Sequence, residues 1–485
     1  MQTLVRLMLV LSIGLTAFGW QAASEPQCGI AIVGGTLIDG NGGNPIPDSV
    51  VLVRGQRILA AGSGEKVKAT SCKETIDAKG KTVMPGLINS NTHLSLTSSS
   101  FINPPGSDTG NATEEEAIRK LPRAQENIRR SLNILLMQGV TSVRDTNGFG
   151  TPLLAVKREI DRNEFAGSRM FLGTLSICSP QQYERIMRNV GPMATALKDR
   201  FRPIYKVPDD LKPIEVPEIN FWKITLSGGD WGDRNAISDQ LLKQIVEEGH
   251  RAGKMVDAHV FGAVGIRSGL DAGLDIMEHP NLGRPIPMPL IEEFAAKGVF
   301  LSPLHTVVEG FVEIFDDPYI LNDPIYKSAL QPYEYEKVQA IKVRMIEARK
   351  HPDWRFEDID SSLRNMSLNE WHTAVEFCRE NLRNYIKAKA RIIMSTDTGG
   401  THFNFPEMAW HVRELKTYVR YGMTPIEALQ TATKNAGEAL KMGNELGTID
   451  AGKLADIIVV NGNPLEDMDA LYHVDVVIKD GIRYK

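Results

Sequence analysis

The stretch Val83-Met-Pro-Gly-Leu-Ile-Asn-Ser-Asn-Thr-His-Leu94 decides which fold this chain is expected to adopt. Its apolar beginning, residues 83–88, predicts a strand, and its polar end, residues 89–93, predicts the carboxyl-terminal exit from that strand. His93 stands at the tip of the stretch. We therefore expect a strand that delivers an imidazole to one edge of a sheet.

The segments at the two ends of the chain have a similar β-rich character. Before this stretch, Ile30–Val33, Ser49–Val53 and Arg57–Ala60 are short strand candidates separated by glycine-containing turns. Turns and short strands return from residue 446 to residue 485. We expect residues 28–84 and 441–485 to form one composite β-sandwich domain.

The central part of the chain alternates strands with helices. Such alternation indicates a parallel sheet, and eight strands predict a (β/α)8 TIM barrel, here residues 85–440 inserted into the β-sandwich. Helices are expected after Thr113, over residues 239–252 and over residues 425–435. The interval between strands seven and eight is too long for one crossover, so we expect a helical and loop excursion over 316–370 near the barrel mouth. The strands expected after the first are Gly139–Asp145, Arg169–Thr174, Ile219–Thr225, Met255–His259, Leu274–His279, Val299–Ser302 and Arg391–Asp397.

The first residues have the pattern of a secretory signal. Arg6 precedes an apolar run, residues 7–20, and small residues follow at 22–24. This order predicts a cleaved signal peptide, residues 1–23, and a secreted or periplasmic protein, with an uncleaved anchor as the alternative. In an oxidising compartment Cys28 and Cys72 are the plausible disulfide pair, and free buried thiols are the other interpretation.

Composition excludes little but favours an ordinary globular protein. The 485 residues are 42% hydrophobic and 24% charged, with a net charge of −5. This balance gives no electrostatic argument for binding nucleic acid or an anionic membrane. A small-molecule substrate is the expected partner, and association between copies of the chain is left open.

Five ionisable residues lie at or near the ends of expected strands. They are His93, Lys223, His259, His279 and Asp397. The carboxyl ends of barrel strands meet at one rim, where active sites of this fold lie. Imidazole, carboxylate and a lysine brought together there are suitable ligands for a divalent transition metal. A single strand-end histidine is better explained as structural. A lysine within the apolar run 219–225 is informative because burying an unpaired charge is costly, and a strand-edge lysine that reaches solvent is the alternative.

These motifs resemble the amidohydrolase superfamily, in particular its imidazolonepropionase-like and prolidase-like branch. The resemblance covers nearly all of the chain after the signal. It is carried by the motifs Pro85–Ile88, Trp222–Gly229, His259, Met277–His279, Ser395–Asp397, Leu446–Ile449 and Gly452–Asp456.

The resemblance implies a metal centre with a modified lysine. Lys223 would be N6-carboxylated and bridge two divalent ions, expected to be Zn²⁺. His259 and His279 would bind one ion; His93, Asp397 and position 91 would bind the other. Asp397 would also transfer protons between the attacking water and the leaving nitrogen.

Two positions in the first motif depart from the family pattern. Asn89 replaces an aspartate, and Asn91 replaces the first metal-binding histidine. An amide oxygen is a weaker, neutral ligand. Three outcomes stay open: two metals with Asn91 as an oxygen ligand, one metal on Lys223, His259 and His279, or an inactive site.

Other polar residues are candidates for the pocket wall. Phe261 stands where peptidase-like relatives often have a tyrosine, which weakens a dipeptidase assignment because phenylalanine cannot donate a hydrogen bond. The remaining pocket candidates, each as readily structural, are Arg144, Asp145, residues 227–229, His305 and the region 402–411.

These features predict an exported metal-dependent amidohydrolase. Its substrate would contain a C–N bond in an amide, a cyclic amide or a dipeptide-like group. The alternatives are a deaminase or lactonase on the same fold, and a non-catalytic barrel whose metal site has decayed. Retention of five ligand-type residues favours an enzyme.

Overall fold

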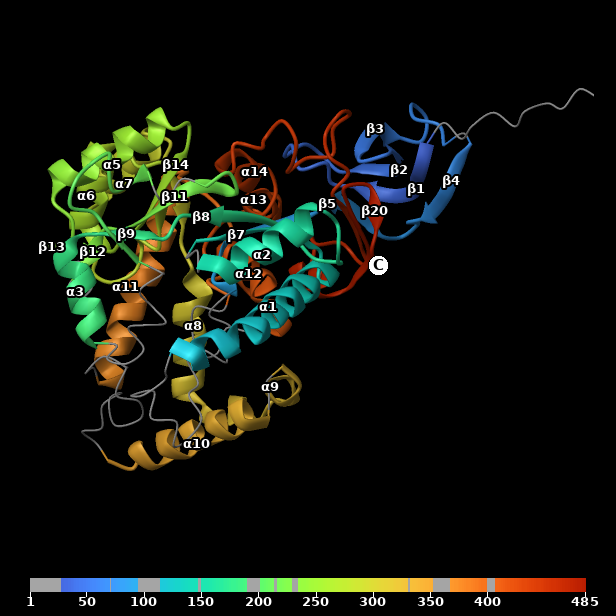
Figure 1. Ribbon diagram of the computed structural model, residues 1–485. Coiled ribbons are helices and arrows are strands. Elements are labelled where there is room, and N and C mark those ends of the chain that lie inside the picture. Colours follow the sequence, from blue (N-terminus) through green and yellow to red (C-terminus); the bar gives the residue numbers. More distant parts are fainter. Residues whose placement is uncertain are drawn as a thin grey trace, which may run out of the picture.

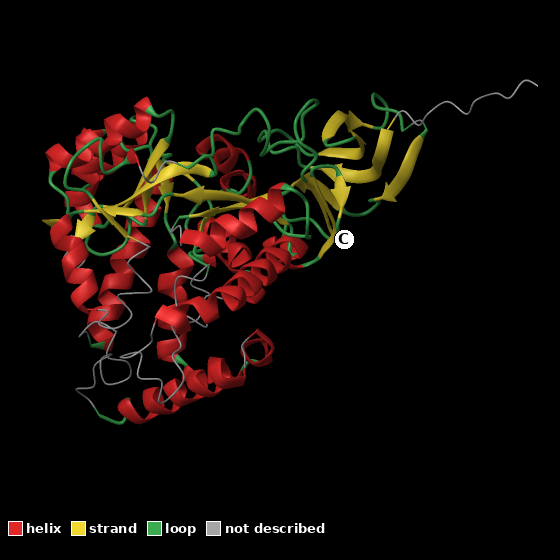
Figure 2. Cartoon of the chain, viewed as in Figure 1, coloured by secondary structure: helices red, strands yellow, loops and turns green. Residues whose placement is uncertain are grey.

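The computed structural model describes residues 28–69, 71–94, 114–146, 150–189, 201–212, 216–228, 234–329, 332–351, 367–398 and 406–485. The expected signal peptide lies outside the described residues, and so do Thr113, Gly229 and His402. A small sheet lies at one end of the molecule, and a larger sheet with helices around it makes up the rest (Figure 1). Figure 2 shows that the small domain is almost entirely strands and loops.

The small sheet unites the two ends of the described chain. Its order is β20-β19-β18-β5-β1-β2-β3, with β4 beside β1. β5 (Thr82–Pro85) pairs antiparallel with β18 (Ile457–Val460), which confirms that the β-rich segments combine. Apolar side chains from both segments form one buried cluster within it. The remaining strands are β1 (Cys28–Leu37), β2 (Ile46–Arg54), β3 (Arg57–Ser63), β4 (Cys72–Asp77), β19 (Val474–Lys479) and β20 (Ile482–Arg483).

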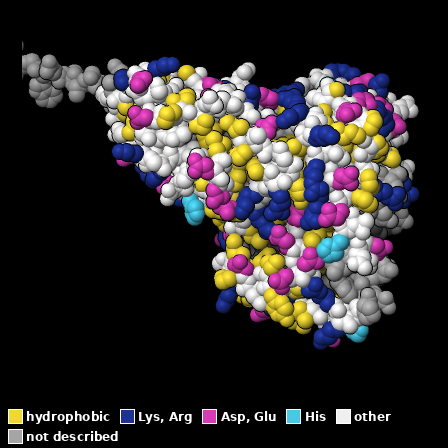
Figure 3. Space-filling model, turned by 180° about the vertical axis from the view of Figure 1, so that it is seen from behind, with side chains coloured by type: hydrophobic (Ala, Val, Ile, Leu, Met, Phe, Trp, Pro, Cys, Tyr) yellow, Lys and Arg dark blue, Asp and Glu magenta, His cyan; other side chains and the backbone are white. Residues whose placement is uncertain are grey.

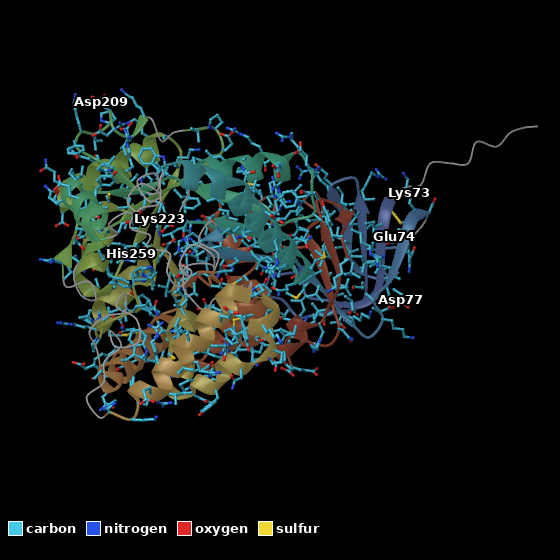
Figure 4. All side chains as sticks on the ribbon, turned by 60° about the horizontal axis from the view of Figure 1, so that its bottom comes forward. Lys73, Glu74, Asp77, Asp209, Lys223 and His259 are labelled. Carbon is cyan, nitrogen blue, oxygen red and sulfur yellow. A yellow bond between two sulfur atoms is a disulfide. The ribbon has the colours of Figure 1, made fainter. Side chains whose placement is uncertain are left out.

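A disulfide fastens the outer part of this sheet. Cys28 and Cys72 are bonded and stand opposite each other where β1 and β4 pair in parallel. The bond lies beside Lys73 and Glu74 in Figure 4. The predicted pairing is therefore confirmed, whereas Cys178 and Cys378 are buried free thiols.

The stretch 83–94 supplies strands to both sheets. The prediction of one strand over 83–88 is wrong, because Thr82–Pro85 belongs to the small sheet and β6 (Leu87–Thr92) to the barrel. Gly86 separates them and donates its N–H to the carbonyl of Asp456. A Cβ at position 86 would lie 2.3 Å from Oγ1 of Thr141, so only glycine fits between the two sheets.

The large sheet is a parallel barrel. The sheet order β17-β16-β15-β14-β11-β8-β7-β6 confirms the (β/α)8 architecture. A parallel bridge between Thr92 and Thr398, and a 2.9 Å bond from the N–H of Ser90 to the carbonyl of Met394, connect its first strand with the residues that follow its last strand. Its strands after β6 are β7 (Val140–Asp145), β8 (Arg169–Gly173), β11 (Ile219–Thr225), β14 (Met255–His259), β15 (Ile276–Glu278), β16 (Phe300–Ser302) and β17 (Arg391–Ile392).

Short strands that the sequence did not predict are β9 (Ser176–Cys178), β10 (Phe201–Pro203), β12 (Ser227–Gly228) and β13 (Arg234–Asn235).

Helices pack their apolar faces against this barrel and share its main core. The barrel helices are α1 (Glu114–Met137), α2 (Gly150–Asp161), α3 (Pro180–Asn189), α5 (Asp239–Arg251), α6 (Gly262–Ala272), α7 (Met288–Ala296), α12 (Trp410–Arg420), α13 (Pro425–Thr431) and α14 (Lys434–Ala439), with one-turn helices η8 (Pro406–Met408) and η9 (Met468–Tyr472) nearby.

Two expected elements depart most from their predicted bounds, and the strand expected over Leu274–His279 is regular only over Ile276–Glu278. The last barrel strand is regular only over Arg391–Ile392 rather than to Asp397. The helix expected over 425–435 divides into α13 and α14, because the carbonyls of Thr431 and Ala432 accept hydrogen bonds from the barrel N–H groups of Met394 and Ile88. Tertiary bonding thus replaces helical bonding there.

An excursion of helices leaves the carboxyl end of β16. Figure 1 shows α8, α9 and α10 projecting from one side of the barrel. A separate apolar cluster, which includes Phe315, Leu321 and Val338, holds these helices together. The excursion consists of α8 (His305–Asp316), η6 (Pro318–Asn322), α9 (Pro324–Ala329), α10 (Pro332–Ala348) and α11 (Leu368–Lys387).

The surface mixes charges of both signs. On the described part of the face in Figure 3, Lys and Arg side chains alternate with Asp and Glu side chains. Such mixing produces no long-range field of one sign on that face. Among the described residues, no helix combines the length and apolar character needed to cross a membrane.

Candidate functional site

The five strand-end residues lie at the same rim of the barrel. Lys223 is on β11, His259 ends β14 and His279 follows β15, while His93 and Asp397 follow the first and last strands. The parallel register pairs Lys223 with Asp257 and Thr225 with His259, which brings the lysine and the imidazole onto neighbouring strands. Figure 4 shows Lys223 and His259 close together.

Two of these residues have an unusual backbone. His279 has φ of +43° and Asp397 has φ of +56°, in the left-handed region that side chains rarely adopt. Strained backbone of this kind concentrates at functional sites because the surrounding structure has to hold it in place. The strain therefore agrees with a functional rim.

His259 and His279 form one half of the site. Their ring centroids are 4.3 Å apart. Nδ1 of His279 is 3.2 Å from the carbonyl oxygen of Val260, and this contact orients the ring. Nε2 is then the ring nitrogen that could bind a metal. Burial, followed by the neighbouring His259 and Lys223, lowers the pKa of His279 well below its usual range. His279 is thus neutral, which is the form that binds metals.

Lys223 lies deep beside this histidine pair. Its side chain is 5% exposed and its Nζ contacts Oε2 of Glu278 directly, with Oδ2 of Asp257 3.9 Å away. Burial lowers the pKa of Lys223 to about 8, against the opposing effect of Asp257. A lysine with this pKa exchanges readily between the ammonium and the neutral amine.

His93 and Asp397 form the other half. Nε2 of His93 is 2.6 Å from Oδ1 of Asp397, and both side chains retain some exposure, 13% and 18%. The N–H of Asp397 donates to the carbonyl of Asn91, 3.0 Å away. A histidine and a carboxylate in direct contact can exchange a proton with a bound molecule.

Asn91 lies behind this pair and is fully buried. Its Oδ1 accepts a 2.7 Å hydrogen bond from the hydroxyl of Thr146. Its Nδ2 is buried and has no hydrogen-bond partner among the described residues. The amide oxygen, which is the only atom of this side chain that could bind a metal, is therefore engaged by Thr146.

A network of buried charges surrounds Lys223, and of its members only Arg144 is among the candidates from the sequence. Arg144 is 2.6 Å from Asp257 and 3.7 Å from Glu278, and all three side chains are at most 2% exposed. The sequence contains a signal for these residues, because a charged side chain inside an apolar strand segment is unusual, as it is for Lys223. Asp257 and Glu278 were overlooked beside the histidines that follow them.

The remaining candidates have structural partners. Oδ2 of Asp145 accepts a hydrogen bond from the N–H of Leu94, and Ser227 accepts one from the N–H of Phe261. His305 is buried against Glu309. His411 is buried, and burial lowers its pKa to about 4.

Phe261 covers the histidine pair. Its ring centroid is 4.6 Å from that of His259 and 4.7 Å from that of His279. An apolar ring there restricts access of water to the imidazoles and offers a packing surface but no hydrogen bond.

The two halves differ in how well they fit a divalent metal ion. No group of three or more His, Cys, Asp or Glu side chains in the described ranges is arranged to hold a metal. With Lys223 as a third ligand, however, His259 and His279 supply a set of the kind that binds zinc. His93 and Asp397 supply only two groups, which contact each other directly. The residues therefore fit one metal ion at the histidine pair better than a second ion at the other half.

The chain resembles known hydrolases in sequence. Residues 334–483 match the model of the amidohydrolase family. An ochratoxinase from Aspergillus niger is 28% identical over 254 residues, a match that covers 51% of this chain and only 42% of the ochratoxinase. An imidazolonepropionase from Geobacillus sp. (strain WCH70) is 22% identical over 467 residues, which is 90% of each chain.

Solved structures share the fold. A Xaa-Pro dipeptidase with bound methionine in its active site superposes with a TM-score of 0.70, at 21% identity, over 94% of this chain and 99% of the dipeptidase. Agreement over nearly the whole length extends the likeness beyond the barrel to the small sheet.

Proposed function

We propose, since the chain belongs to the amidohydrolase superfamily, that it is a metal-dependent hydrolase of carbon–nitrogen bonds in an amide, a cyclic amide or a dipeptide-like compound. The observation that carries the proposal is the set of His259, His279 and Lys223. The imidazoles have ring centroids 4.3 Å apart, and His259 ends the strand next to that of Lys223, a buried lysine with a lowered pKa, while His279 follows the strand after it.

Lys223 would hold the metal after reacting with CO₂. Its neutral amine nitrogen forms a bond to the carbon of CO₂ and releases one proton, which leaves a negatively charged carbamate. With a pKa of about 8, roughly 10% of such a lysine is neutral at pH 7, far more than for an exposed lysine. The carbamate nitrogen keeps one hydrogen, so its contact with Glu278 can persist after the reaction.

The metal would contribute acidity. A divalent ion held by these side chains supplies an acidified water molecule and a Lewis acid that polarises a carbonyl group. Asp397 would accept the proton of the attacking water and return it to the leaving nitrogen, while His93, 2.6 Å away, orients the carboxylate. Phe261 would pack against an apolar part of the substrate.

A single metal ion is the stoichiometry that the geometry supports. The amide oxygen of Asn91 is a weak, neutral ligand that already accepts a hydrogen bond from Thr146, so His93 and Asp397 are the two strong ligand groups at the second position. Zinc suits imidazole and carbamate ligands.

Export is part of the proposal. The apolar segment within residues 1–23 has the pattern of a signal peptide. The Cys28–Cys72 disulfide supports it independently, because such bonds persist in oxidising compartments. Fractionation of cells that express the full chain, with Edman sequencing of the mature N-terminus, tests this part.

The decisive experiment combines metal analysis with an assay panel. Purified protein, Lys223→Ala and His279→Ala are compared for zinc content by mass spectrometry and for hydrolysis of N-acyl amino acids, dipeptides, cyclic amides and lactones. His473→Ala, an exposed histidine of the small domain, is the matched control. We expect zinc in the wild type and control, and loss of zinc and turnover in the two site variants.

The same panel separates the alternatives. Release of ammonia would identify a deaminase, and turnover confined to lactones a lactonase. Bound zinc with no turnover would favour a non-catalytic barrel. A wild type that binds no divalent metal even after reconstitution with bicarbonate would end the hydrolase proposal.

A further inference from the structure

We infer that Arg144 is a positioning residue whose guanidinium, acting through Asp257 and Glu278, fixes the place of the Lys223 amine. The inference rests on the proposed function, because Lys223 has a metal-binding role only there. Arg144 itself touches neither the histidine pair nor the proposed substrate position in any described contact. Its effect on the site is therefore indirect.

Arg144 connects several barrel strands below the rim. One guanidinium nitrogen, Nη2, donates to Oδ2 of Asp257 on β14 over 2.6 Å, and the other, Nη1, donates to the carbonyl of Ser90 on β6 over 3.1 Å. The guanidinium carbon lies 3.7 Å from the ring centroid of Phe221 on β11. Three contacts in three directions determine where this side chain lies.

Two carboxylates transmit that placement to Lys223. Oδ2 of Asp257 accepts from Arg144 and lies 3.9 Å from Nζ of Lys223. Glu278 contacts Nζ through Oε2, while its Oε1 is 3.7 Å from Nη1 of Arg144. Each carboxylate thus stands between the two cations.

Burial makes this arrangement difficult to rearrange. The four side chains are between 0% and 5% exposed, and their two positive and two negative charges balance when the lysine is an ammonium. A buried charge that loses its partner is strongly unfavourable, so each group restrains the others. Moving the guanidinium would therefore move the lysine.

The variant Arg144→Lys separates a positioning role of this side chain from a role that needs only its charge. Arg144→Lys keeps the positive charge, but a single ammonium cannot reproduce the planar fork that reaches Ser90 and Asp257 together. If Arg144 supplied charge alone, the conservative variant would restore wild-type behaviour. If it positions Lys223, the variant would not.

The test measures metal affinity of the full-length metal-free protein. Zn²⁺ is titrated calorimetrically, in bicarbonate buffer, into the wild type, Arg144→Lys and the control Arg169→Lys. Arg169 is a second poorly exposed arginine of the barrel, and it pairs with Asp456 and Asp480 at the small sheet. We expect about 10–100-fold weaker binding for Arg144→Lys and no change for the control. Wild-type affinity in folded Arg144→Lys overturns the inference.

Two further measurements keep the outcomes distinct. If Arg144→Lys fails to fold, the charge-balanced variant Arg144→Met with Asp257→Asn takes its place, with the same expected loss and the same overturning result. If the wild type binds no metal, the proposed function fails, and crystal structures decide the inference separately. Nζ of Lys223 should then leave Glu278 in Arg144→Lys, and an unchanged position of Nζ refutes the positioning role.

Discussion

Replacing both half-cystines of the small sheet, Cys28→Ser with Cys72→Ser, should destabilise that sheet by a calculable amount. The bond joins residues 44 positions apart. In the chain-entropy treatment, closing a loop of this length in the unfolded chain is worth about 4 kcal/mol at 25 °C. Removal of native disulfides costs about 2–5 kcal/mol in practice, and we expect the loss of unfolding free energy to lie in that range.

Hydrogen exchange is the suitable assay, because the small domain has no tryptophan of its own. All six tryptophans lie outside residues 28–84 and 441–485, so tryptophan fluorescence reports on other parts of the chain. Mass spectrometry of peptides from β1 and β4 measures opening of the sheet directly. A loss of 2 kcal/mol or more corresponds to exchange faster by about 30-fold or more, whereas peptides from β14 should change little.

Reduction supplies the control. Wild type treated with dithiothreitol should exchange like the double variant, and the variant itself should not respond to the reductant. Equal exchange of β1 in untreated wild type and in the double variant would refute the reasoning. Alkylation of both thiols in untreated wild type would refute it as well.

Three further predictions concern the metal site, the pH response and the junction between the sheets. Asn91→His should raise bound zinc from one towards two ions per chain, measured by mass spectrometry, and an unchanged ratio would argue against position 91 as the missing ligand. The pKa of His411 is about 4 in the folded protein, below the ordinary value of about 6.5. As the pH falls from 6.5 to 4, the unfolded state therefore binds a proton that the folded state does not, and the unfolding free energy decreases by up to about 3 kcal/mol. His411→Leu should remove that part of the pH dependence when the unfolding free energy is measured by urea titration at pH 7 and pH 4.5. If wild type and variant lose the same unfolding free energy between the two pH values, His411 is not its source. Gly86→Ala should lower the unfolding free energy by about 1–3 kcal/mol through its clash with Thr141, whereas Gly43→Ala, which has open space, should not; equal stability of the two variants would count against the clash.

The bounds of two central barrel strands could be predicted from their apolar runs. Residues 219–225 and 255–259 are strands over the same bounds as expected, because burial of the barrel strands leaves a clear boundary at their polar ends. The split at Gly86 could not be predicted, since the partner of Thr82–Pro85 is β18, near the other end of the chain. The early end of α13 has a similar cause, because the carbonyl groups of Thr431 and Ala432 accept hydrogen bonds from N–H groups of the barrel.

The sequence predicts which polar residues end or follow the barrel strands, but not the contacts between their side chains. Lys223 stood out as a charge inside an apolar strand, and the structure shows which groups make its burial tolerable, namely Asp257 and Glu278. Local sequence does not reveal such pairs, because the register between neighbouring parallel strands decides which side chains meet. The hydrogen bond from the Thr146 hydroxyl to Oδ1 of Asn91 likewise joins residues that local sequence does not connect.

The pairing of β5 with β18 also has a consequence for how the chain acquires its structure during synthesis. β1 to β5 are made first, yet the edge of β5 stays open until residues 457–460 emerge, after the whole barrel has been translated. Contacts so distant in sequence form slowly, and an open strand edge is a site for pairing with other chains. Chains released before residue 457 should therefore aggregate through β5. The rate-limiting step of refolding should be the pairing of β5 with β18 rather than formation of the barrel.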